Sequence, residues 1–494
     1  MQSLEEKTSI EDNIVAFDRS PPSSVRGMKV LDRNAFKKVI QVPSIAVPCK
    51  DLKSLLRKVK PYLFKFRFIN AVADLAKNDP AFKSYKLLLL DPDSCGSVEK
   101  IPESLKTILK DRKVDFENGF RMTKLELDYN NWNATETIHA ILPEDVDNIS
   151  GFSVVGHIAH LNLNEEALPY KHIIGQVFLD KTPTIKTVVN KLNTIDNTFR
   201  NFQMEVLAGE ENFVTRVREN GFVFEMDFSK VYWNSRLGTE HQRIVSELNE
   251  GDVLYDIFAG VGPFAIPAAK KAVFVYANDL NPASFEALEK NTKIRENKVN
   301  SEFIKCYNLD GREFIKTVIK KDLSERLCNR TVDGEETRKT KIHIVMNLPA
   351  IAVEFLDTFR GLLANFKKDI ADSLYLPYVY CYFFSKNVDY PEDELRERLK
   401  SSIGDLPPGY SVRFVRNVAP KKDMFCFNFQ LSRSYLCDEE DEIKEDVKKC
   451  QEKSSGTLDI AEEKTDIEDE VERKQKYNLE GCEPDQKKLK LDTS

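Results

Sequence analysis

The chain has 494 residues, of which 41% are hydrophobic and 31% are charged. Because a domain usually holds roughly 100 to 200 residues, this length predicts about two to four domains. No apolar run approaches the ~20 residues of a membrane span, so we expect no membrane insertion. The nine cysteines are scattered and none has the spacing of zinc ligands, which indicates free thiols in a reducing compartment and predicts no metal site.

Charge is distributed unevenly along the chain. The net charge is −7, but residues 434–494 alone contain 20 acidic and 11 basic residues and therefore carry −9, which leaves +2 on the remainder. A mildly basic body can present a local basic face to RNA. The acidic segment has no apolar periodicity, so we predict a disordered tail that is dispensable for catalysis.

The first 27 residues are polar and include the run Pro21-Pro22-Ser23-Ser24, which predicts a flexible leader. Residues 28–149 mix short apolar and basic units and predict an α+β accessory domain, with a buried strand at residues 85–90. A turn-rich stretch near residue 149 marks the first domain boundary.

A smaller α/β unit is predicted for residues 150–230. It begins with a strand-like run at residues 152–163, and a helix at residues 182–192 is expected to precede strands at residues 202–207 and 221–228.

Residues 231–433 show short apolar strands that alternate with helical segments. Strands are predicted at residues 253–258 and 273–277, and helices at 265–271 and 284–296. This alternation predicts a doubly wound, mostly parallel sheet of the Rossmann-like class. The charged stretch at residues 321–341 lacks periodicity and is interpreted as a loop within this domain.

A glycine turn follows the first strand of this sheet. The strand ends at Asp256, and Gly260 and Gly262 would let the backbone approach a bound adenosyl group closely. The next strand ends at Asp279, where an acid can bind ribose hydroxyls. A nicotinamide enzyme would place an acid at the same point, but Pro263 and the missing third glycine of a GxGxxG motif disfavour that alternative.

Two later strand ends carry further polar groups. Asp310 precedes Gly311 at the end of the third strand and suits an adenine amino group. The fourth strand ends in Asn347-Leu348-Pro349, a turn that is typical of methyltransferases acting on amino groups or ring nitrogens of bases. Its rigid backbone and the Asn347 side chain can hold a planar base beside a methyl donor.

The chain resembles the eukaryotic and archaeal tRNA (guanine-N1) methyltransferase family that acts at tRNA position 37. The resemblance extends over residues 25–431 and also includes the glycine turn, Asn347-Leu348-Pro349 and Phe355-Leu356. Its other motifs are VRGM at residues 25–28, GHIAHLNL at 156–163, FR at 199–200, EVLAGE at 205–210 and YWNSRLGTEH at 232–241. It implies a class I methyltransferase domain behind two small RNA-binding domains.

This resemblance also implies catalytic roles. Attack by guanine N1 on a sulfonium methyl group requires a base for the N1 proton and a cation for the charge that develops on O6. Glu240 matches the family's proposed general base, Arg200 the residue at O6, and Asn347 the residue that holds the base. Tyr232 matches an aromatic residue near the site.

The resemblance further implies S-adenosyl-L-methionine as the cofactor. His241 is expected near its methionyl carboxylate, although archaeal relatives tend to have arginine at this position. The expected cofactor-binding residues are His241, Asp256, Gly260, Gly262, Asp279, Leu280, Asp310, Gly311 and Asn347.

The implied partner is tRNA, bound at its anticodon loop and at its elbow, by a protein that acts as a monomer without an obligate protein partner. The resemblance also implies a location in the mitochondrial matrix, nucleus and cytoplasm. Candidate RNA contacts are Arg57, Lys58, Lys60, Lys65, Arg67, Lys186, Lys191, Arg216 and Arg218.

Two alternatives share the predicted fold. One is a transferase that moves the aminocarboxypropyl group of the same cofactor during wybutosine synthesis, and Asn347-Leu348-Pro349 disfavours it. The other is an inactive RNA-binding relative, which the presence of Arg200, Glu240 and Asp279 disfavours.

Overall fold

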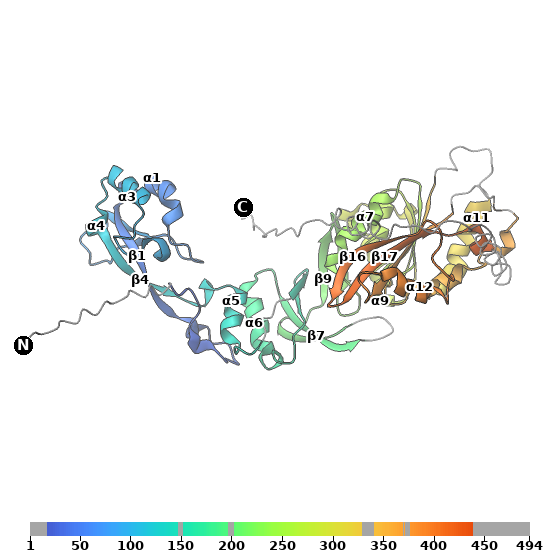
Figure 1. The fold of residues 1–494 in the computed structure, drawn as a ribbon, viewed down its shortest axis with the longest axis horizontal. Coiled ribbons are helices and arrows are strands. Elements are labelled where there is room, and N and C mark those ends of the chain that lie inside the picture. The colour runs from blue at the N-terminus through green and yellow to red at the C-terminus, as the bar shows by residue number, and fades with distance from the viewer. Residues whose placement is uncertain are drawn as a thin grey trace, which may run out of the picture.

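A computed structural model describes residues 17–146, 152–195, 202–328, 340–368, 370 and 376–437. The strands of these residues form four sheets, and Figure 1 shows them in chain order from an N-terminal unit to a large C-terminal sheet. Among the described helices, none is long and apolar enough to cross a membrane.

The N-terminal unit is built on a four-stranded antiparallel sheet. Strand β1 (Lys38–Pro48) lies between β3 (Tyr85–Leu89) and β4 (Phe120–Leu127), and β2 (Val72–Asp74) pairs with β3 at the edge. The helices of this region are α1 (Cys49–Val59), α2 (Pro92–Cys95), α3 (Glu103–Asp111), α4 (Phe116–Gly119) and α5 (Ala134–Ile141). Helices α1 and α3 pack on the sheet and bury Leu55, Leu105 and Leu109 against its strands.

The middle unit contains a second four-stranded sheet in the order β5-β6-β7-β8. Its elements are β5 (Phe152–Val155), β6 (Ile158–Leu161), α6 (Lys171–Lys181), β7 (Thr187–Ile195) and β8 (Phe202–Gly209). Helix α6 connects the parallel strands β6 and β7, and it approaches β8 closely at Gly175, where an added Cβ would lie 2.6 Å from the Cβ of Leu207. A bulkier residue there would push the helix off the sheet.

The helix predicted at residues 182–192 is wrong. Strand β7 occupies most of this segment, and the helix of the unit lies earlier, at α6. Val188, Val189 and Asn190 are all buried, so this strand lacks the alternation of a half-exposed strand. A short run that is buried on both faces cannot be told from a helix by periodicity alone, and its β-branched residues favour the extended form.

The leader predicted to be flexible up to residue 27 differs from the structure in its described part. Val25 is fully buried and Phe17 packs against the same cluster, which also contains Trp132, Ile141 and Ile174. This cluster draws on both sides of the boundary predicted near residue 149. Residue 149 itself lies outside the described residues, and the domain limits stay predictions.

A two-stranded ribbon leads into the C-terminal sheet. Strands β9 (Val214–Glu219) and β10 (Phe222–Asp227) pair through a tight turn in which Asn220 and Gly221 both have positive φ. The Asn297 and Asn291 side chains accept hydrogen bonds of 2.8 Å from the backbone amides of Val223 and Glu225. These bonds attach the ribbon to the C-terminal domain.

The C-terminal sheet has seven strands in the order β13-β12-β11-β14-β15-β17-β16. Five of them run parallel, β17 is antiparallel to β15, and β16 closes the edge. The strands are β11 (Val253–Asp256), β12 (Phe274–Asn278), β13 (Ile304–Tyr307), β14 (Ile342–Met346), β15 (Tyr378–Ser385), β16 (Ser411–Ala419) and β17 (Lys422–Gln430). The predicted doubly wound, mostly parallel sheet is confirmed.

Helices cover both faces of this sheet (Figure 1). Helices α7 (Gly238–Glu247), α8 (Ala265–Lys270) and α9 (Pro282–Thr292) contribute to the core of one face. The core of the other face includes residues of α10 (Gly311–Phe314), α11 (Lys320–Cys328), α12 (Pro391–Leu399) and α13 (Arg433–Cys437). Strands β12 and β14 lie on opposite sides of β11, so the chain order reverses at β11. In open α/β sheets, ligands bind at the carboxyl ends of the strands at such a point.

The loop predicted at residues 321–341 is wrong for its first part, because α11 continues to Cys328. Leu323 and Leu327 lie one helical turn apart and are both fully buried, although charged residues surround them in the sequence. Asp322 accepts hydrogen bonds from the hydroxyls of Tyr255 and Tyr276, each 2.6 Å long. Residues 329–339 lie outside the described residues.

Candidate functional site

The carboxyl ends of β11, β12 and β13 are held together by a buried asparagine. The side-chain amide of Asn278 donates to the carbonyls of Ile257 and Leu309, and its oxygen accepts from the Leu309 amide at 3.0 Å. Each bond joins the end of β12 to a segment that follows a neighbouring strand. Asn278 therefore fixes the relative positions of the three strand ends on which the predicted cofactor residues lie.

The glycine turn after β11 requires its two glycines for different reasons. Gly262 has φ +100°, and an added Cβ would lie 2.7 Å from the Leu288 side chain. Gly260 has φ +55°, yet an added Cβ would meet nothing within 4 Å. Gly262 therefore serves the packing of the turn on α9, whereas Gly260 keeps a strand end open to an approaching ligand.

Asp279 is bound directly to this turn. Its Oδ2 accepts a hydrogen bond of 2.8 Å from the amide of Gly260, and its Oδ1 accepts one of 2.9 Å from Asn281. Burial raises the pKa of Asp279 against the opposing effect of these bonds. The sequence places both residues at strand ends, and the structure brings them into contact.

Asp256 is a fully buried carboxylate at the end of β11. Neither of its oxygens makes a hydrogen bond of normal geometry to a described residue. Burial and the neighbouring Asp279 raise its pKa well above the usual range, against a smaller effect of the Phe258 backbone. Such a group is costly to keep charged unless a donor or a cation satisfies it.

The end of β13 combines an acid with an apolar slot. Asp310 caps α10 by accepting from the Arg312 amide at 2.9 Å, and it stays exposed. An added Cβ at Gly311 would lie 3.0 Å from Phe355 and 3.1 Å from Phe258. These two partly exposed rings meet edge to face, with centroids 5.1 Å apart.

These strand ends fit an adenosyl cofactor. Gly260 leaves room for it, Leu280 is exposed beside Asp279, and Phe258 and Phe355 offer the apolar surface that an adenine ring needs. The unsatisfied carboxylate of Asp256 suits a ligand that brings hydrogen-bond donors or positive charge. Sequence reasoning missed Phe258 as a wall of this slot, and the only signal for it was its place between Asp256 and the glycine turn.

Asn347 lies directly after β14, at the next strand end along the sheet. It is partly buried, and its side-chain amide makes no hydrogen bond to any residue in the described part of the chain. The carbonyl of Pro349 accepts a hydrogen bond from the amide of Phe384 on β15, which fixes the turn. The arrangement leaves the Asn347 amide available to a ligand beside the glycine turn.

Glu240 is a buried carboxylate in the first turn of α7. Arg243 binds both of its oxygens, at 2.8 Å from Nε and 2.6 Å from Nη2, and the hydroxyl of Tyr382 donates to Oε1 at 2.7 Å. Phe264, which follows the glycine turn, packs against both Tyr382 and His241. Glu240 is therefore linked to the glycine turn through Tyr382 and Phe264.

His241 is buried next to Glu240, and its imidazole contacts an acidic side chain. Its Nδ1 lies 2.7 Å from Oε1 of Glu219 on β9. If His241 also bound the methionyl carboxylate of the cofactor, that group would lie near the carboxylate of Glu219. The role expected for His241 did not include this second acid. Glu219 precedes the turn of the ribbon and had no signal in the sequence that would have paired it with His241.

Tyr232 lies on the segment that leads to α7, and half of its surface is exposed. Its hydroxyl accepts a hydrogen bond from Asn234, which in turn accepts one from Arg416 on the edge strand β16. Burial and the neighbouring Arg236 lower the pKa of Arg416 from its usual value. Arg236 has no acidic partner among the described residues, so this rim of the site is positively charged.

Arg200 lies outside the described residues, so the structure does not test its position. The other predicted site residues fall into two groups: those around the strand ends, and those on α7 and the segment before it. The first group is Asp256, Gly260, Gly262, Asp279, Leu280, Asp310, Gly311 and Asn347, and the second is Tyr232, Glu240 and His241. Among described residues there is no cluster of three or more histidine, cysteine or acidic side chains that could hold a metal.

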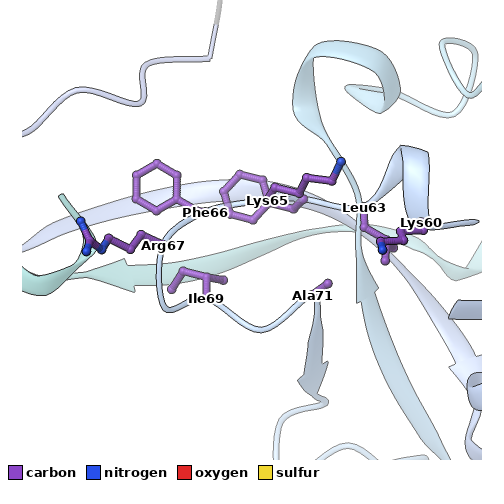
Figure 2. A pocket seen from close by; sticks show the side chains of 8 residues that line it. Lys60, Leu63, Lys65, Phe66, Arg67, Ile69 and Ala71 are labelled. Atoms are coloured by element: carbon purple, nitrogen blue, oxygen red, sulfur yellow. The ribbon is translucent and has the colours of Figure 1, made fainter. Parts of the chain in front are cut away.

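A separate surface hollow of about 510 Å³ lies in the N-terminal unit, far along the chain from the strand ends. Figure 2 shows Lys65, Phe66 and Arg67 on one loop segment, with Lys60 beside Leu63. Three of the RNA-contact candidates thus share one surface. Arg216, by contrast, forms ion pairs with Glu225 and Glu296 and is less available to RNA.

Comparisons with family models match the middle unit and much of the C-terminal domain. A family model described as the TRM5/TYW2 methyltransferase domain matches residues 215–366, and one described as the TYW2 N-terminal domain matches residues 134–212. A tRNA (guanine(37)-N(1))-methyltransferase of Xenopus tropicalis is 48% identical over 417 residues, which are 84% of this chain and 81% of that protein. The Danio rerio protein of the same name is 47% identical over 421 residues, 84% of each chain.

Solved structures agree in fold. A structure described as the complex of aTrm5 and tRNALeu is 23% identical, with a TM-score of 0.53, over 79% of this chain and 100% of that one. A crystal structure of Trm5b from Pyrococcus abyssi is 24% identical, with a TM-score of 0.50, over 79% and 99%. At these identities the likeness supports the architecture alone.

Proposed function

This chain belongs to the family of tRNA (guanine(37)-N(1))-methyltransferases, and we propose that Glu240, Arg200 and Asn347 perform the chemistry of that family in it. The enzyme binds tRNA and methylates N1 of guanosine 37, with S-adenosylmethionine as the cofactor. The roles of its individual residues are the part that we propose.

The strand ends of β11, β12 and β13 would hold the cofactor. When bound, S-adenosylmethionine supplies a methyl group from its sulfonium, and the electrons of the broken bond stay on sulfur. Asp279 would bind the ribose hydroxyls, Asp310 the adenine amino group, and Gly260 would admit the ligand to the turn. Phe258 and Phe355 would exclude water from the adenine.

Three residues act on the guanine. Glu240 accepts the proton of N1, so that the N1 lone pair is free to form the new bond. Arg200 stabilises the negative charge that develops on O6, and the free amide of Asn347 holds the edge of the base. The base must leave its stack in the anticodon loop to reach this site.

The observation that carries the proposal is the free amide of Asn347 beside a strand end whose neighbours fit an adenosyl cofactor. The test is methyl transfer from labelled S-adenosylmethionine to unmodified tRNA with guanosine or adenosine at position 37. We expect N1-methylguanosine from the first tRNA and no label in the second. Product at another nucleotide, or no product, would contradict the assignment.

Glu240→Gln tests the general base. We expect kcat to fall by about 10²- to 10⁴-fold, the usual contribution of acid–base catalysis, because the amide cannot accept the N1 proton. The dissociation constant of S-adenosylhomocysteine should stay within about twofold, since Glu240 is not among the strand-end residues. The matched control is Glu250→Gln, an exposed acid just after α7, which we expect to leave kcat within about twofold of wild type.

Aminocarboxypropyl transfer is the alternative that the same fold allows. The curated relatives named here are methyltransferases, and the intact Asn347-Leu348-Pro349 turn also supports methyl transfer. A donor labelled in its aminocarboxypropyl carbons separates the two reactions. Label in the tRNA would favour the alternative.

We also propose, from family resemblance alone, that the protein is a monomer and that it is found in the mitochondrial matrix, nucleus and cytoplasm. Mass measurement by light scattering tests the first expectation, and imaging of the tagged full-length chain tests the second. A stable dimer, or a single compartment, would contradict them.

A further inference from the structure

The Glu240 carboxylate sits in a pocket made by three elements. Arg243 comes from its own helix α7, Tyr382 from β15 and Cys426 from β17, and these are the charged or titratable side chains that face it in the described chain. Tyr382 and Cys426 are completely buried, and the side chains of Glu240 and Arg243 are 9% and 17% exposed. Solvent therefore does little to screen this group.

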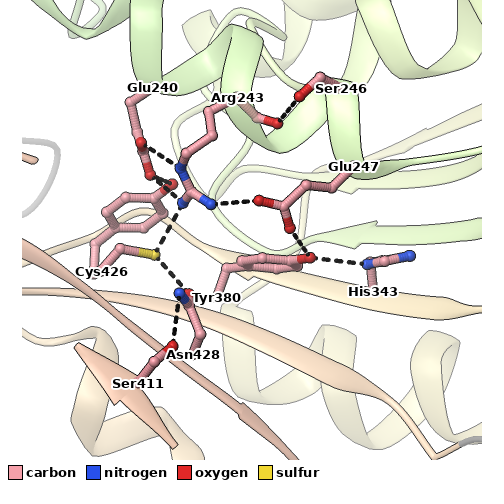
Figure 3. A network of polar contacts seen from close by, with 10 residues as sticks. Glu240, Arg243, Ser246, Glu247, His343, Tyr380, Ser411, Cys426 and Asn428 are labelled. Carbon is pink, nitrogen blue, oxygen red and sulfur yellow. Dashed lines mark hydrogen bonds and ion pairs between the residues drawn. The ribbon is translucent and has the colours of Figure 1, made fainter. Parts of the chain in front are cut away.

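Arg243 is itself held on its far side. Its Nη1 donates to Oε1 of Glu247 at 2.6 Å, and the hydroxyl of Tyr380 donates to Oε2 of the same carboxylate at 2.7 Å. Beyond Tyr380 lies His343, with its Nδ1 3.3 Å from the hydroxyl. Figure 3 shows Arg243 between Glu240 and Glu247, with Tyr380 and His343 continuing the chain of contacts across the sheet.

The Glu240 carboxylate can accept one hydrogen bond more than it accepts from its protein contacts. An ionised carboxylate offers about four lone-pair sites. Arg243 uses two of them and Tyr382 uses a third, so one site is left for a substrate proton. A planar guanidinium bound to both oxygens also fixes the plane of the carboxylate, which a single-point ammonium would not do.

We propose that Arg243 and Tyr382 are positioning residues that hold the Glu240 carboxylate against a cation and in one orientation for the N1 proton of guanosine 37. This inference rests on the proposed function, because it concerns the base assigned there. Glu247 serves as the outer anchor of Arg243. Tyr382 is completely buried and Arg243 is paired with Glu240 and Glu247, so the effect of both residues on the reaction is exerted through Glu240.

The charge states follow from this arrangement. Against the cost of burial, the hydrogen bond and charge of Glu240 raise the pKa of Arg243, so its cation persists at all working pH values. Burial, Cys426 and Glu240 together raise the pKa of Tyr382 well above its usual range, so its hydroxyl keeps the proton that it donates. A buried carboxylate that loses its cation needs a higher pH to become charged.

The same chain contains a matched control. Asp322 on α11 accepts from Arg326 at 2.7 Å and from the hydroxyls of Tyr255 and Tyr276, which reproduces the arginine and tyrosine contacts of Glu240. This cluster lies on the opposite face of the sheet, where Leu323 and Leu327 join the other core. Loss of Arg326 should therefore cost stability without changing catalysis.

The experiment measures kcat against pH for full-length wild-type protein, Arg243→Gln, Arg243→Lys, Tyr382→Phe and Arg326→Gln, at saturating S-adenosylmethionine and tRNA. For Arg243→Gln we expect the acidic limb of the profile to move up by about 1 to 3 pH units. Arg243→Lys should restore the limb but not the full kcat. Tyr382→Phe should lower kcat by about threefold to tenfold at every pH.

Binding measurements separate positioning from folding. The KM for tRNA and the dissociation constant of S-adenosylhomocysteine should stay within about twofold of wild type in each folded variant, because the proposed role gives Arg243 and Tyr382 no contact with either ligand. Arg326→Gln should keep the wild-type profile. In a Glu240→Gln background, adding Arg243→Gln should have no further effect on kcat.

Three results would overturn the inference. One is a folded Arg243→Gln protein with the wild-type kcat and pH profile, although Glu240→Gln is inactive. Another is full activity of Glu240→Gln, which removes the proposed base and its positioning residues together. If Arg243→Gln does not fold, Arg243→Lys and Tyr382→Phe decide the matter, and the full wild-type kcat in both contradicts the role.

Discussion

At the scale of single residues, the strand ends proposed to hold the cofactor combine a carboxylate whose burial is unfavourable with a glycine that leaves space for a ligand. Asp256 is fully buried, and its pKa is raised by burial and by Asp279. Gly260 next to it leaves space that no described side chain fills. This arrangement suits a ligand with hydrogen-bond donors, because such donors would offset the unfavourable free energy of burying the Asp256 carboxylate.

The Asp256→Asn variant tests the free energy of burying the Asp256 carboxylate through the pH dependence of protein stability. Because the folded pKa lies above the unfolded one, the folded state binds more protons between the two values, and the unfolding free energy falls as pH rises through that window. The asparagine variant should lack this contribution, which amounts at most to about 1.4 kcal/mol per pH unit. Denaturant unfolding of the ligand-free proteins from about pH 4 upward measures it. Identical slopes in the two proteins would contradict the expectation.

Alanine at the two glycines separates packing from binding. Gly262→Ala should destabilise the protein by about 2 kcal/mol, because its Cβ meets Leu288 at a positive φ. Gly260→Ala should cost only about 1 kcal/mol, from its backbone conformation alone. S-adenosylhomocysteine affinity should nevertheless fall more for Gly260→Ala. Unfolding and calorimetric titration of both variants give the comparison, and the reverse ranking in affinity would disprove it.

At the scale of elements, strand ends and helices are fixed by single polar side chains that are fully or largely buried. Asn278 joins three strand ends, and Asp322 attaches α11 to the central strands through Tyr255 and Tyr276. Because a buried polar group is stable only when its hydrogen bonds are formed, such side chains favour one packing arrangement of the elements they join. The charged sequence around Asp322 is therefore a helix with one anchored face.

Asp322→Ala should destabilise the protein by about 3 kcal/mol, since it leaves Arg326 and two tyrosine hydroxyls without their acceptor. The exposed Glu325 on the same helix provides the control, and its alanine variant should stay within about 0.5 kcal/mol of wild type. Urea unfolding compares the two. Equal stability of both variants would show that Asp322 does not anchor α11.

At the scale of the whole molecule, the end of the described chain belongs to the fold. Leu436 is fully buried, and the Tyr435 carbonyl accepts a hydrogen bond from the Gly361 amide. The described chain therefore packs against this domain at least to Cys437, which is 2% exposed and lies beyond residue 433, the predicted end of the domain. The acidic residues that follow are outside the described part of the chain.

Truncation after Cys437 should leave kcat within about twofold of the full-length protein. Truncation after Arg433 should cost about 3 kcal/mol or more of stability, because it removes the buried side chains of Tyr435, Leu436 and Cys437. Steady-state methylation and thermal unfolding of both truncated proteins test the pair. A loss of activity in the longer one, at unchanged stability, would assign the acidic segment a part in catalysis.

The sequence by itself determined the class of the C-terminal domain, the glycine turn and the acids at Asp279 and Asp310, because parallel strands and their polar ends are local patterns. It misassigned two elements. Strand β7 is buried on both faces and shows no strand-like alternation, and the charged neighbours of Leu323 and Leu327 hid the helical period of α11. Only the tertiary structure decided the partners of Glu240. Arg243 lies one turn away, but Tyr382 and Cys426 are more than 140 residues distant, and contacts between elements so far apart depend on sheet order, which no local pattern encodes.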